Sequence, residues 1–226
     1  MSTSTSPSGA WPPPTGLTTK AVPQSHAVVN LSASAKISAS AHIVFTILTQ
    51  TPTYPSWNTF VPRVTIHSQP ADISPDDDTL RLGTDFSFHV VMDERKPDSA
   101  NMTRLAVTDL STPEYPSSYL SPEFLDANPC FSPASASSRI YRIGWTSSPK
   151  AGLISYGLKA ERFHEVIPLG EGECEVKTWE CQGGPLAWAV KWMFGKVLER
   201  KFGEWCEGLK VESEKRCAEI KESGGM

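Results

Sequence analysis

The feature that most limits how this chain can fold is a long series of strand patterns that ends in one long helix pattern. Between residues 61 and 182, segments rich in β-branched and aromatic residues follow one another with no helix pattern between them. A helix start, Gly183-Gly184-Pro185, comes next, with proline at the first helical position, where a missing N–H costs nothing. Consecutive strands without intervening helices predict an antiparallel meander.

A second helix pattern lies near the N-terminus. Apolar residues from Ala41 to Leu48 form one stripe, Ser38 or Ser40 can cap the helix, and Pro52 follows its end. The last helix is expected to run from Pro185 to about residue 220. The chain therefore predicts an α+β fold, a curved antiparallel sheet wrapped around a long C-terminal helix with an internal cavity. The expected strands are 28–33, 61–67, 79–92, 103–110, 139–146, 158–168 and 174–182.

Composition divides the 226 residues into one domain with polar ends. Residues 1–25 are rich in Ser, Thr and Pro and are expected to be a disordered tail, because such a segment buries little apolar area. The domain is expected over 26–212, and 213–226 is expected to be a polar C-terminal tail. A Ser- and Pro-rich insertion at 111–136 interrupts the strands. Two interpretations of it stay open, a lid over a cavity or a loose insertion.

Several classes of function are disfavoured. A net charge of −4 and a pI near 5.8 give no electrostatic basis for binding nucleic acid. The chain has no run of about 18 apolar residues and no secretory signal, so a cytoplasmic location is expected. Its five cysteines form no CxxC pair and are expected to be reduced thiols. Neither a metal site nor a cofactor is predicted, and the oligomeric state stays open.

Several motifs, taken in order, resemble those of the SRPBCC superfamily, which includes START lipid-transfer domains and polyketide cyclases. The resemblance covers most of residues 27–212. It implies a helix-grip fold, with a cavity between a bent sheet and the C-terminal helix, and apolar or amphipathic ligands. It does not fix an activity, because carriers and cyclases share the fold. The motifs are Ile37-Ser38-Ala39-Ser40-Ala41, Tyr54-Pro55-x-Trp57-Asn58-x-Phe60-Val61, Leu82-Gly83-Thr84-x-Phe86-x-Phe88, the stretch from Glu161-Arg162-Phe163 to Gly170, and the stretch from Thr178-Trp179-Glu180 to Gly184.

Strand parity selects a small polar group. Arg162 and His164 share one face of their strand, and Thr178 and Glu180 share one face of the next. If both faces point inward, the four side chains meet in an otherwise apolar cavity. In one interpretation Arg162 holds an oxyanion or carbonyl while His164 or Glu180 moves a proton. In the other, Arg162 and Glu180 form a structural cross-strand pair, with His164 hydrogen-bonded nearby.

Aromatic residues supply the rest of the predicted ligand-binding wall. Trp188 and Trp192 open the last helix and are expected to be buried in that wall, with an exposed patch that contacts a membrane or a protein as the alternative. His89 has the opposite parity to Phe88 and is expected to be exposed. The other predicted wall residues are Trp57, Phe86, Phe88, Tyr141 and Trp145.

The leading hypothesis is a protein that binds a hydrophobic small molecule, such as a lipid, an isoprenoid quinone or a polyketide-like compound, in its internal cavity. The alternative is a polyketide cyclase or aromatase of secondary metabolism that uses Arg162, His164 and Glu180 for acid–base chemistry. A third hypothesis is an interaction module that uses the 111–136 insertion and the Trp188/Trp192 patch to contact a membrane, at its periphery, or a protein. The sequence leaves open whether the protein catalyses a reaction.

Overall fold

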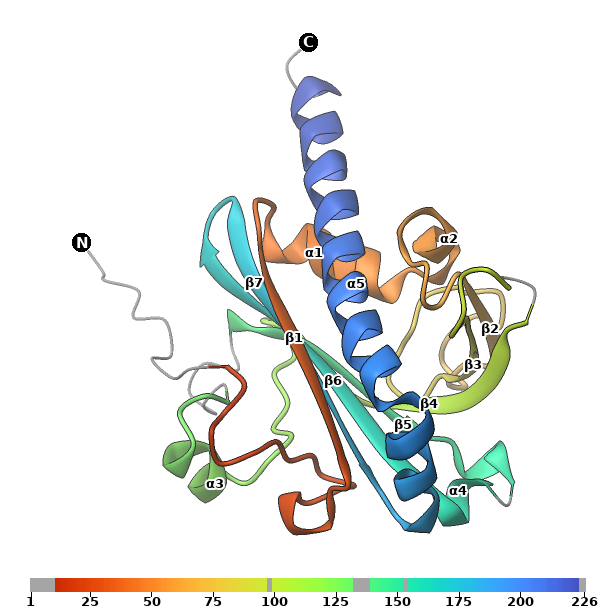
Figure 1. Ribbon diagram of the computed structural model, residues 1–226. Coiled ribbons are helices and arrows are strands. Elements are labelled where there is room, and N and C mark those ends of the chain that lie inside the picture. Colours follow the sequence, from red (N-terminus) through yellow and green to blue (C-terminus); the bar gives the residue numbers. More distant parts are fainter. Residues whose placement is uncertain (1–10, 97–98, 132–138, 153, 224–226) are drawn as a thin grey trace.

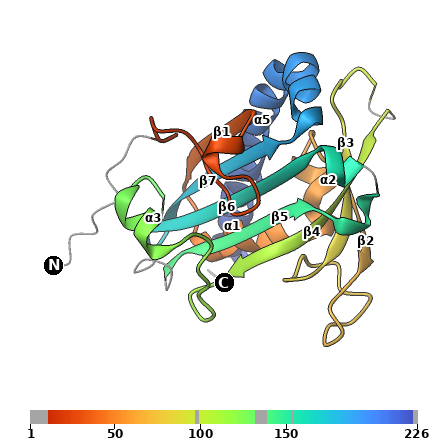
Figure 2. The ribbon, with the colours of Figure 1, turned by 90° about the horizontal axis from the view of Figure 1, so that it is seen from below.

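A seven-stranded antiparallel sheet bends around a 39-residue helix, α5 (Pro185–Ser223), in the computed structural model of the protein (Figure 1). The structure describes residues 11–96, 99–131, 139–152 and 154–223. The strands lie in the order β1-β7-β6-β5-β4-β3-β2. Figure 2 shows β7, β6, β5 and β4 side by side. The strands are β1 (Val29–Ile37), β2 (Arg63–Ser68), β3 (Asp85–Val90), β4 (Asn101–Ser111), β5 (Tyr141–Ser147), β6 (Lys159–Gly170) and β7 (Glu173–Gly183).

The shorter helices lie between strands. They are α1 (Ala41–Thr49), α2 (Tyr54–Trp57), α3 (Pro122–Ala127) and α4 (Ile154–Gly157), with 3-10 turns at Gln24–His26, Thr51–Thr53 and Pro149–Ala151. Ser40 caps α1 as predicted, since its hydroxyl accepts a hydrogen bond from the Ile43 amide at 3.4 Å. The predicted fold class and the order of its strands are confirmed.

Two glycines allow α5 to begin where it does. Gly184 has a φ of +92°, and a Cβ there would lie 2.6 Å from the carbonyl oxygen of Gly157. A Cβ on Gly157 would in turn lie 2.7 Å from Leu186 Cδ1. The chain can therefore turn directly from β7 into α5 only because both positions lack a side chain.

The inner core lies between the concave face of the sheet and α5. On α5, Trp205 makes edge-on contacts with Tyr54 and Trp57, at ring-centroid distances of 5.8 and 5.4 Å. Leu198, Phe202 and Leu209 belong to the same core. Burial of these large side chains supplies most of the free energy that holds α5 against the sheet.

A second core covers the outer face of the same sheet. Phe163 and Trp179 project outward and stack at a centroid distance of 5.3 Å. Trp11 packs edge-on against Trp179, whose Nε1 donates a hydrogen bond to the carbonyl oxygen of Thr18 at 3.0 Å. Leu17 and Val22 are also buried there. The expectation of a disordered tail is therefore wrong for residues 11–25, because their few apolar side chains cover Trp179. Residues 1–10 lie outside the described residues.

The part of the insertion that the structure describes belongs to the outer core and does not line the cavity. Tyr119, Leu125 and Phe131 are buried against Phe163 and Trp179. Residues 111–131 therefore cover the sheet from the side opposite to α5, and residues 132–136 lie outside the described residues.

The domain does not end at residue 212, where its C-terminal boundary was expected. Helix α5 continues to Ser223 with Ser213 and Cys217 buried, and Glu214 accepts a hydrogen bond from the Ser38 amide at 2.9 Å.

Two tryptophans give a matched test of the outer core. Trp179 is fully buried and Trp192 is 86% exposed. We expect Trp179→Ala to lower the free energy of unfolding by about 3–5 kcal/mol, through lost burial and the cavity left behind. Trp192→Ala is expected to change it by about 0.5 kcal/mol or less. Urea denaturation of both variants measures the difference, and equal values would contradict a packed outer core.

Candidate functional site

A cavity of about 660 Å³ lies between the inner face of the sheet and the N-terminal half of α5. Val190, Phe194, Leu198 and Phe202 form its helical side. Val190 and Phe194 are only half-buried, whereas Trp205 and Leu209 further along α5 are fully packed. The helix therefore closes against the sheet at one end and leaves space at the other. From the sheet, the inward side chains at the cavity include Phe88, Trp145, Ala160, Arg162, Glu180 and Gln182.

Arg162 is the main charged group on this wall. Its side chain lies between β6 and α5, with the guanidinium carbon 3.8 Å from the Phe202 ring centroid and 4.3 Å from that of Trp205. Nε donates a hydrogen bond to the Thr178 hydroxyl at 3.1 Å, while Nη2 has no partner among the described residues. Burial lowers the pKa of Arg162 to about 10, an effect that the Glu180 carboxylate partly offsets. The side chain remains a cation at neutral pH, with donors left for a ligand.

Glu180 faces Arg162 across the strand pair. The two residues are register partners on β6 and β7, and Glu180 accepts a hydrogen bond from Gln182 Nε2 at 2.5 Å. Burial raises the pKa of Glu180, and the nearby Arg162 and the hydrogen bond from Gln182 oppose that rise. A half-buried carboxyl group with a raised pKa on a cavity wall can exchange a proton with a bound molecule.

His164 lies behind the cavity wall, in the inner core. Its ring packs between Trp145 and Trp205, at centroid distances of 4.7 and 5.3 Å, and it is fully buried. Neither of its nitrogens has a hydrogen-bond partner among the described residues. Burial and the neighbouring Arg162 hold its pKa well below the usual range, so the imidazole is neutral. The hydrogen bond expected for His164 in the structural interpretation is therefore not present.

The four polar side chains that strand parity placed on the inner face do lie together on that face of the sheet. Arg162, His164, Thr178 and Glu180 all lie on the inner face, and Arg162 and Glu180 reach the cavity. Phe88 and Trp145 line it as well, whereas Phe86 packs behind them against both rings. Trp57 belongs to the core around Trp205, and Tyr141 is half-buried against Phe45 of α1.

Three predictions about exposure are wrong. Trp188 and Trp192 are 64% and 86% exposed and not in the cavity wall, because their positions on α5 face away from Val190 and Phe194. His89 is buried, since Arg63 Nη2 lies 2.8 Å from its Nδ1 and the Thr65 hydroxyl lies 2.9 Å from its Nε2. An outward-facing strand position was expected to be exposed, yet side chains of the neighbouring strand β2 cover it.

Sequence reasoning missed three kinds of lining residue. Gln182 shares the face of Glu180, and this parity could have identified it. Phe202 lies four residues after Leu198 and could have been found from the helical repeat. Met92 in the β3–β4 connection and Met102 on β4 border the cavity, and no local pattern marks them. No group of three or more His, Cys, Asp or Glu in the described parts of the chain is arranged to hold a metal ion.

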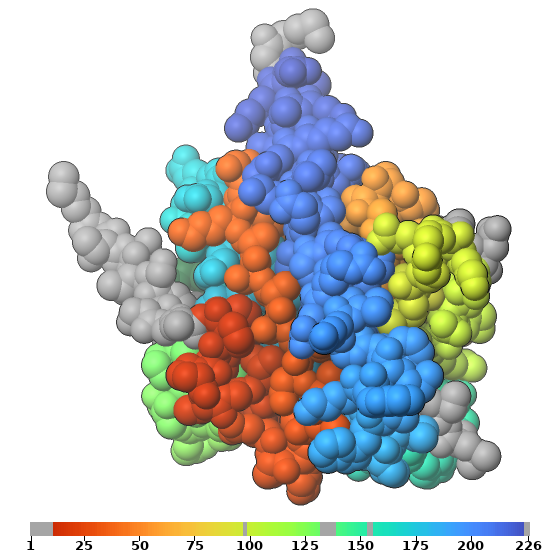
Figure 3. Space-filling model, in the orientation of Figure 1, coloured from red at the N-terminus to blue at the C-terminus, as the bar shows by residue number. Residues whose placement is uncertain are grey.

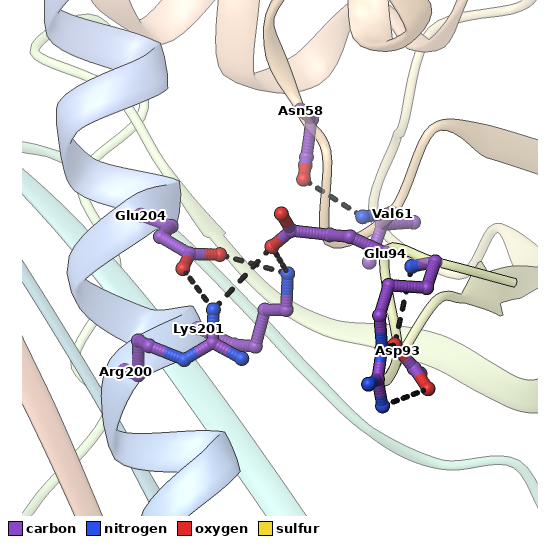
Figure 4. A network of polar contacts seen from close by, with 8 residues as sticks. Asn58, Val61, Asp93, Glu94, Arg200, Lys201 and Glu204 are labelled. Atoms are coloured by element: carbon purple, nitrogen blue, oxygen red, sulfur yellow. Dashed lines mark hydrogen bonds and ion pairs between the residues drawn. The ribbon is translucent and has the colours of Figure 1, made fainter. Parts of the chain in front are cut away.

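An ion-pair network fixes the β3–β4 connection to α5 beside the cavity. Lys201, fully buried on α5, pairs with Glu94 and also with Glu204 at 2.8 Å (Figure 4). Arg200 binds the same two carboxylates at 3.4 and 2.7 Å. Because Met92 lies two residues before Glu94, this network sets the position of one edge of the cavity.

The buried imidazole gives a prediction for the pH dependence of stability. Below about pH 6.5, His164 in the unfolded chain takes up a proton that the folded chain does not bind, so the wild-type protein loses stability as the pH falls. His164→Phe removes this loss. We expect the free energy of unfolding of the variant, relative to wild type, to rise by about 1 kcal/mol between about pH 7 and 5.5. Parallel curves for the two proteins in urea denaturation would contradict a neutral buried His164.

Comparisons with solved structures show the fold. No family model matches the sequence. A hypothetical protein from Helicobacter pylori aligns with a TM-score of 0.56 and 15% identity, covering 81% of this chain and 87% of that one. The Zhui aromatase/cyclase from a Streptomyces species aligns with a TM-score of 0.51 and 11% identity, covering 83% and 94%. At such identities the likeness shows the fold alone, which is the helix-grip fold.

A comparison with curated sequences shows the family. The oxopyrrolidines biosynthesis cluster protein O of Penicillium oxalicum is 32% identical to this chain over 194 residues. The match covers 80% of this chain and 84% of that protein. The chain therefore belongs to the family of the oxopyrrolidines biosynthesis cluster protein O.

Proposed function

We propose that the protein binds a hydrophobic small molecule of secondary metabolism in its internal cavity, and that Arg162 holds a carbonyl or carboxylate oxygen of that molecule. The observation that carries this proposal is the position of the Arg162 guanidinium on the cavity wall, where Nη2 has no partner among the residues that the structure describes. The remaining wall is mostly aromatic and aliphatic, so this donor is a natural point for orienting a ligand.

The size of the cavity fits this class of ligand. A volume of about 660 Å³ lies within the range of roughly 300–1,000 Å³ that is usual for small-molecule sites. A ligand that buries about 300 Å² of apolar area would gain about 7 kcal/mol from desolvation, at about 25 cal/mol per Å². Part of this gain offsets the loss of translational freedom. A charge-assisted hydrogen bond from Arg162 would then set the orientation and add to the affinity.

The family supports a ligand that carries a carbonyl group. The relative from Penicillium oxalicum is named for a cluster that makes oxopyrrolidines, and an oxopyrrolidine by its name has a carbonyl on its ring. A precursor or product with that ring and an apolar remainder matches a mostly apolar cavity that holds the Arg162 guanidinium on its wall. A lipid or quinone with a suitably placed oxygen would use the same contacts.

A second candidate function is that of a cyclase, favoured by Glu180. Its carboxyl group reaches the cavity beside Arg162 and burial raises its pKa, which makes it a candidate general base or acid. Arg162 would stabilise the negative charge that develops on a carbonyl oxygen. His164 is a weaker candidate for proton transfer, because Trp145 and Trp205 separate it from the cavity. The analogy with the fold of an aromatase/cyclase agrees with this role.

The binding function is tested by native mass spectrometry of the purified protein, followed by affinity measurements with the compound found. Arg162→Met is expected to weaken binding about 10- to 100-fold, the loss of one hydrogen bond to a charged group. Arg81→Met is the matched control, because Arg81 is an exposed arginine that pairs with Asp77 away from the cavity. Equal affinity of the Arg162→Met variant and wild type would contradict the role of Arg162. A filling substitution, Ala160→Phe, should abolish binding while circular dichroism stays unchanged.

The cyclase candidate needs a separate measurement. With a poly-β-carbonyl substrate analogue, Glu180→Gln should lower kcat by about 100-fold or more, as expected when a general base is removed. The affinity for the same compound should change little, since an amide keeps the shape and the hydrogen bond with Gln182. Product formation at the wild-type rate would reject Glu180 as the base and leave binding as the function.

A further inference from the structure

An exposed apolar surface lies where α4 meets the first turns of α5. It consists of Tyr156, Leu186, Trp188, Trp192 and Met193, which we call the apolar corner. Their exposed fractions are 82, 45, 64, 86 and 57%, respectively. Leu186 packs on Gly157, which places α4 directly against the start of α5 (Figure 1). Figure 3 shows these first turns, in the lighter blue, on the surface of the molecule. Large apolar side chains gathered in this way on a surface indicate an interaction site.

The two chain segments that form the apolar corner carry charge of one sign. Segments 147–160 and 183–198, which form it, contain no Asp or Glu, although the whole chain has a net charge of −4. They carry Lys150, Lys159, Lys191 and Lys196, all exposed. Lys150 lies 3.5 Å from Asp85, and the other three have no ion pair in the part of the chain that the structure describes. The corner is therefore an aromatic surface with a positively charged rim.

The lysines around the apolar corner favour an anionic lipid surface over a second copy of the chain as its partner. In a symmetric dimer the same patch would face itself, and the lysines would oppose one another. An anionic lipid surface instead supplies the opposite charge to the rim, while its interfacial region accepts tryptophan and tyrosine rings. The first turns of α5 thus combine the aromatic and basic residues that favour a peripheral position on a bilayer.

The apolar corner also adjoins the cavity. Val190 and Phe194 line the cavity from the same turns of α5 that carry Trp188 and Trp192 on their other side. Ala151 and Leu158, from the segment around α4, belong to the cavity wall as well. A membrane that covers the corner would therefore lie next to the cavity.

We propose that the apolar corner is a docking surface for anionic membranes, on which Trp188 and Trp192 insert at the lipid interface and Lys191 and Lys196 contact the headgroups. The evidence for docking is the apolar corner itself and does not depend on the proposed ligand-binding function. Its use, the passage of an apolar molecule between the bilayer and the cavity, rests on the proposed ligand-binding function.

Vesicle co-sedimentation tests the docking. The full-length protein should bind vesicles of phosphatidylcholine with about 30% phosphatidylserine at least tenfold more tightly than vesicles of phosphatidylcholine alone. Raising the salt concentration from about 0.1 to about 0.5 M should weaken this binding, because it screens the lysines. Binding that is equal for both vesicle types, or no binding to either, would overturn the proposal.

Paired variants locate the surface. Trp188→Ser with Trp192→Ser should lower the affinity for the anionic vesicles at least tenfold. Val211→Ser with Ile220→Ser is the matched control, because these residues are 57% and 51% exposed near the other end of α5. Lys191→Glu with Lys196→Glu should also lower the affinity at least tenfold, and Lys215→Glu with Lys221→Glu should lower it less. Wild-type affinity in the tryptophan pair variant would overturn the assignment of the corner.

Light scattering tests the alternative that a second copy of the chain covers the apolar corner. If the wild-type protein is a dimer that the tryptophan substitutions convert to a monomer, the corner is a contact between two copies and the proposal fails. The vesicle assay uses no ligand, so its failure leaves the cavity proposal intact. Conversely, a cavity that binds no small molecule leaves the docking result unchanged.

Discussion

The structure depends on the register between β6 and β7. In this register Arg162 lies opposite Glu180 and Phe163 lies opposite Trp179. Because successive side chains point to opposite faces, one strand pair supplies both the polar group on the inner face and the aromatic stack on the outer face. A slip of β7 by one residue would place Trp179 in the cavity and turn the Glu180 carboxyl group to the outer face. The outer core therefore does more than cover the sheet, since it makes the inner site possible.

The cavity exists because α5 contacts the sheet unevenly. Trp205 and Leu209 are fully packed, and between them and the open half of the helix the Arg162 guanidinium lies against the Phe202 and Trp205 rings. An arginine at this position keeps the helix from settling onto β6. Lys201 of α5 pairs with Glu94 and so holds the β3–β4 connection against the helix. Buried charge is poor evidence of stability in itself, and here it maintains a space that apolar side chains would close.

Local patterns predicted the strands, the two main helices and the inward face of Arg162 and Glu180, because period-two alternation and a helix cap depend on nearby residues alone. The errors concern contacts between segments far apart in the sequence. Composition favoured disorder for residues 11–25, but it could not show that Trp11 would meet Trp179. The first turns of α5 were expected to be buried, whereas the position of Trp192 on the helix turns its ring to solvent. In the candidate site, strand parity predicted that Arg162, His164 and Glu180 share the inner face. Only the tertiary structure shows that His164 lies behind two tryptophan rings.

All five cysteines are free and buried, and they are spread over both cores. Burial raises the pKa of Cys181 on the outer side and of Cys174 on the inner side to about 12, and that of Cys206 on α5 to about 11. Alkylating reagents attack the thiolate and need access to it, so these thiols react only when the surrounding layer opens. The order in which they become modified would therefore record which side of the sheet loosens first. The native chain needs no added probe for such an experiment.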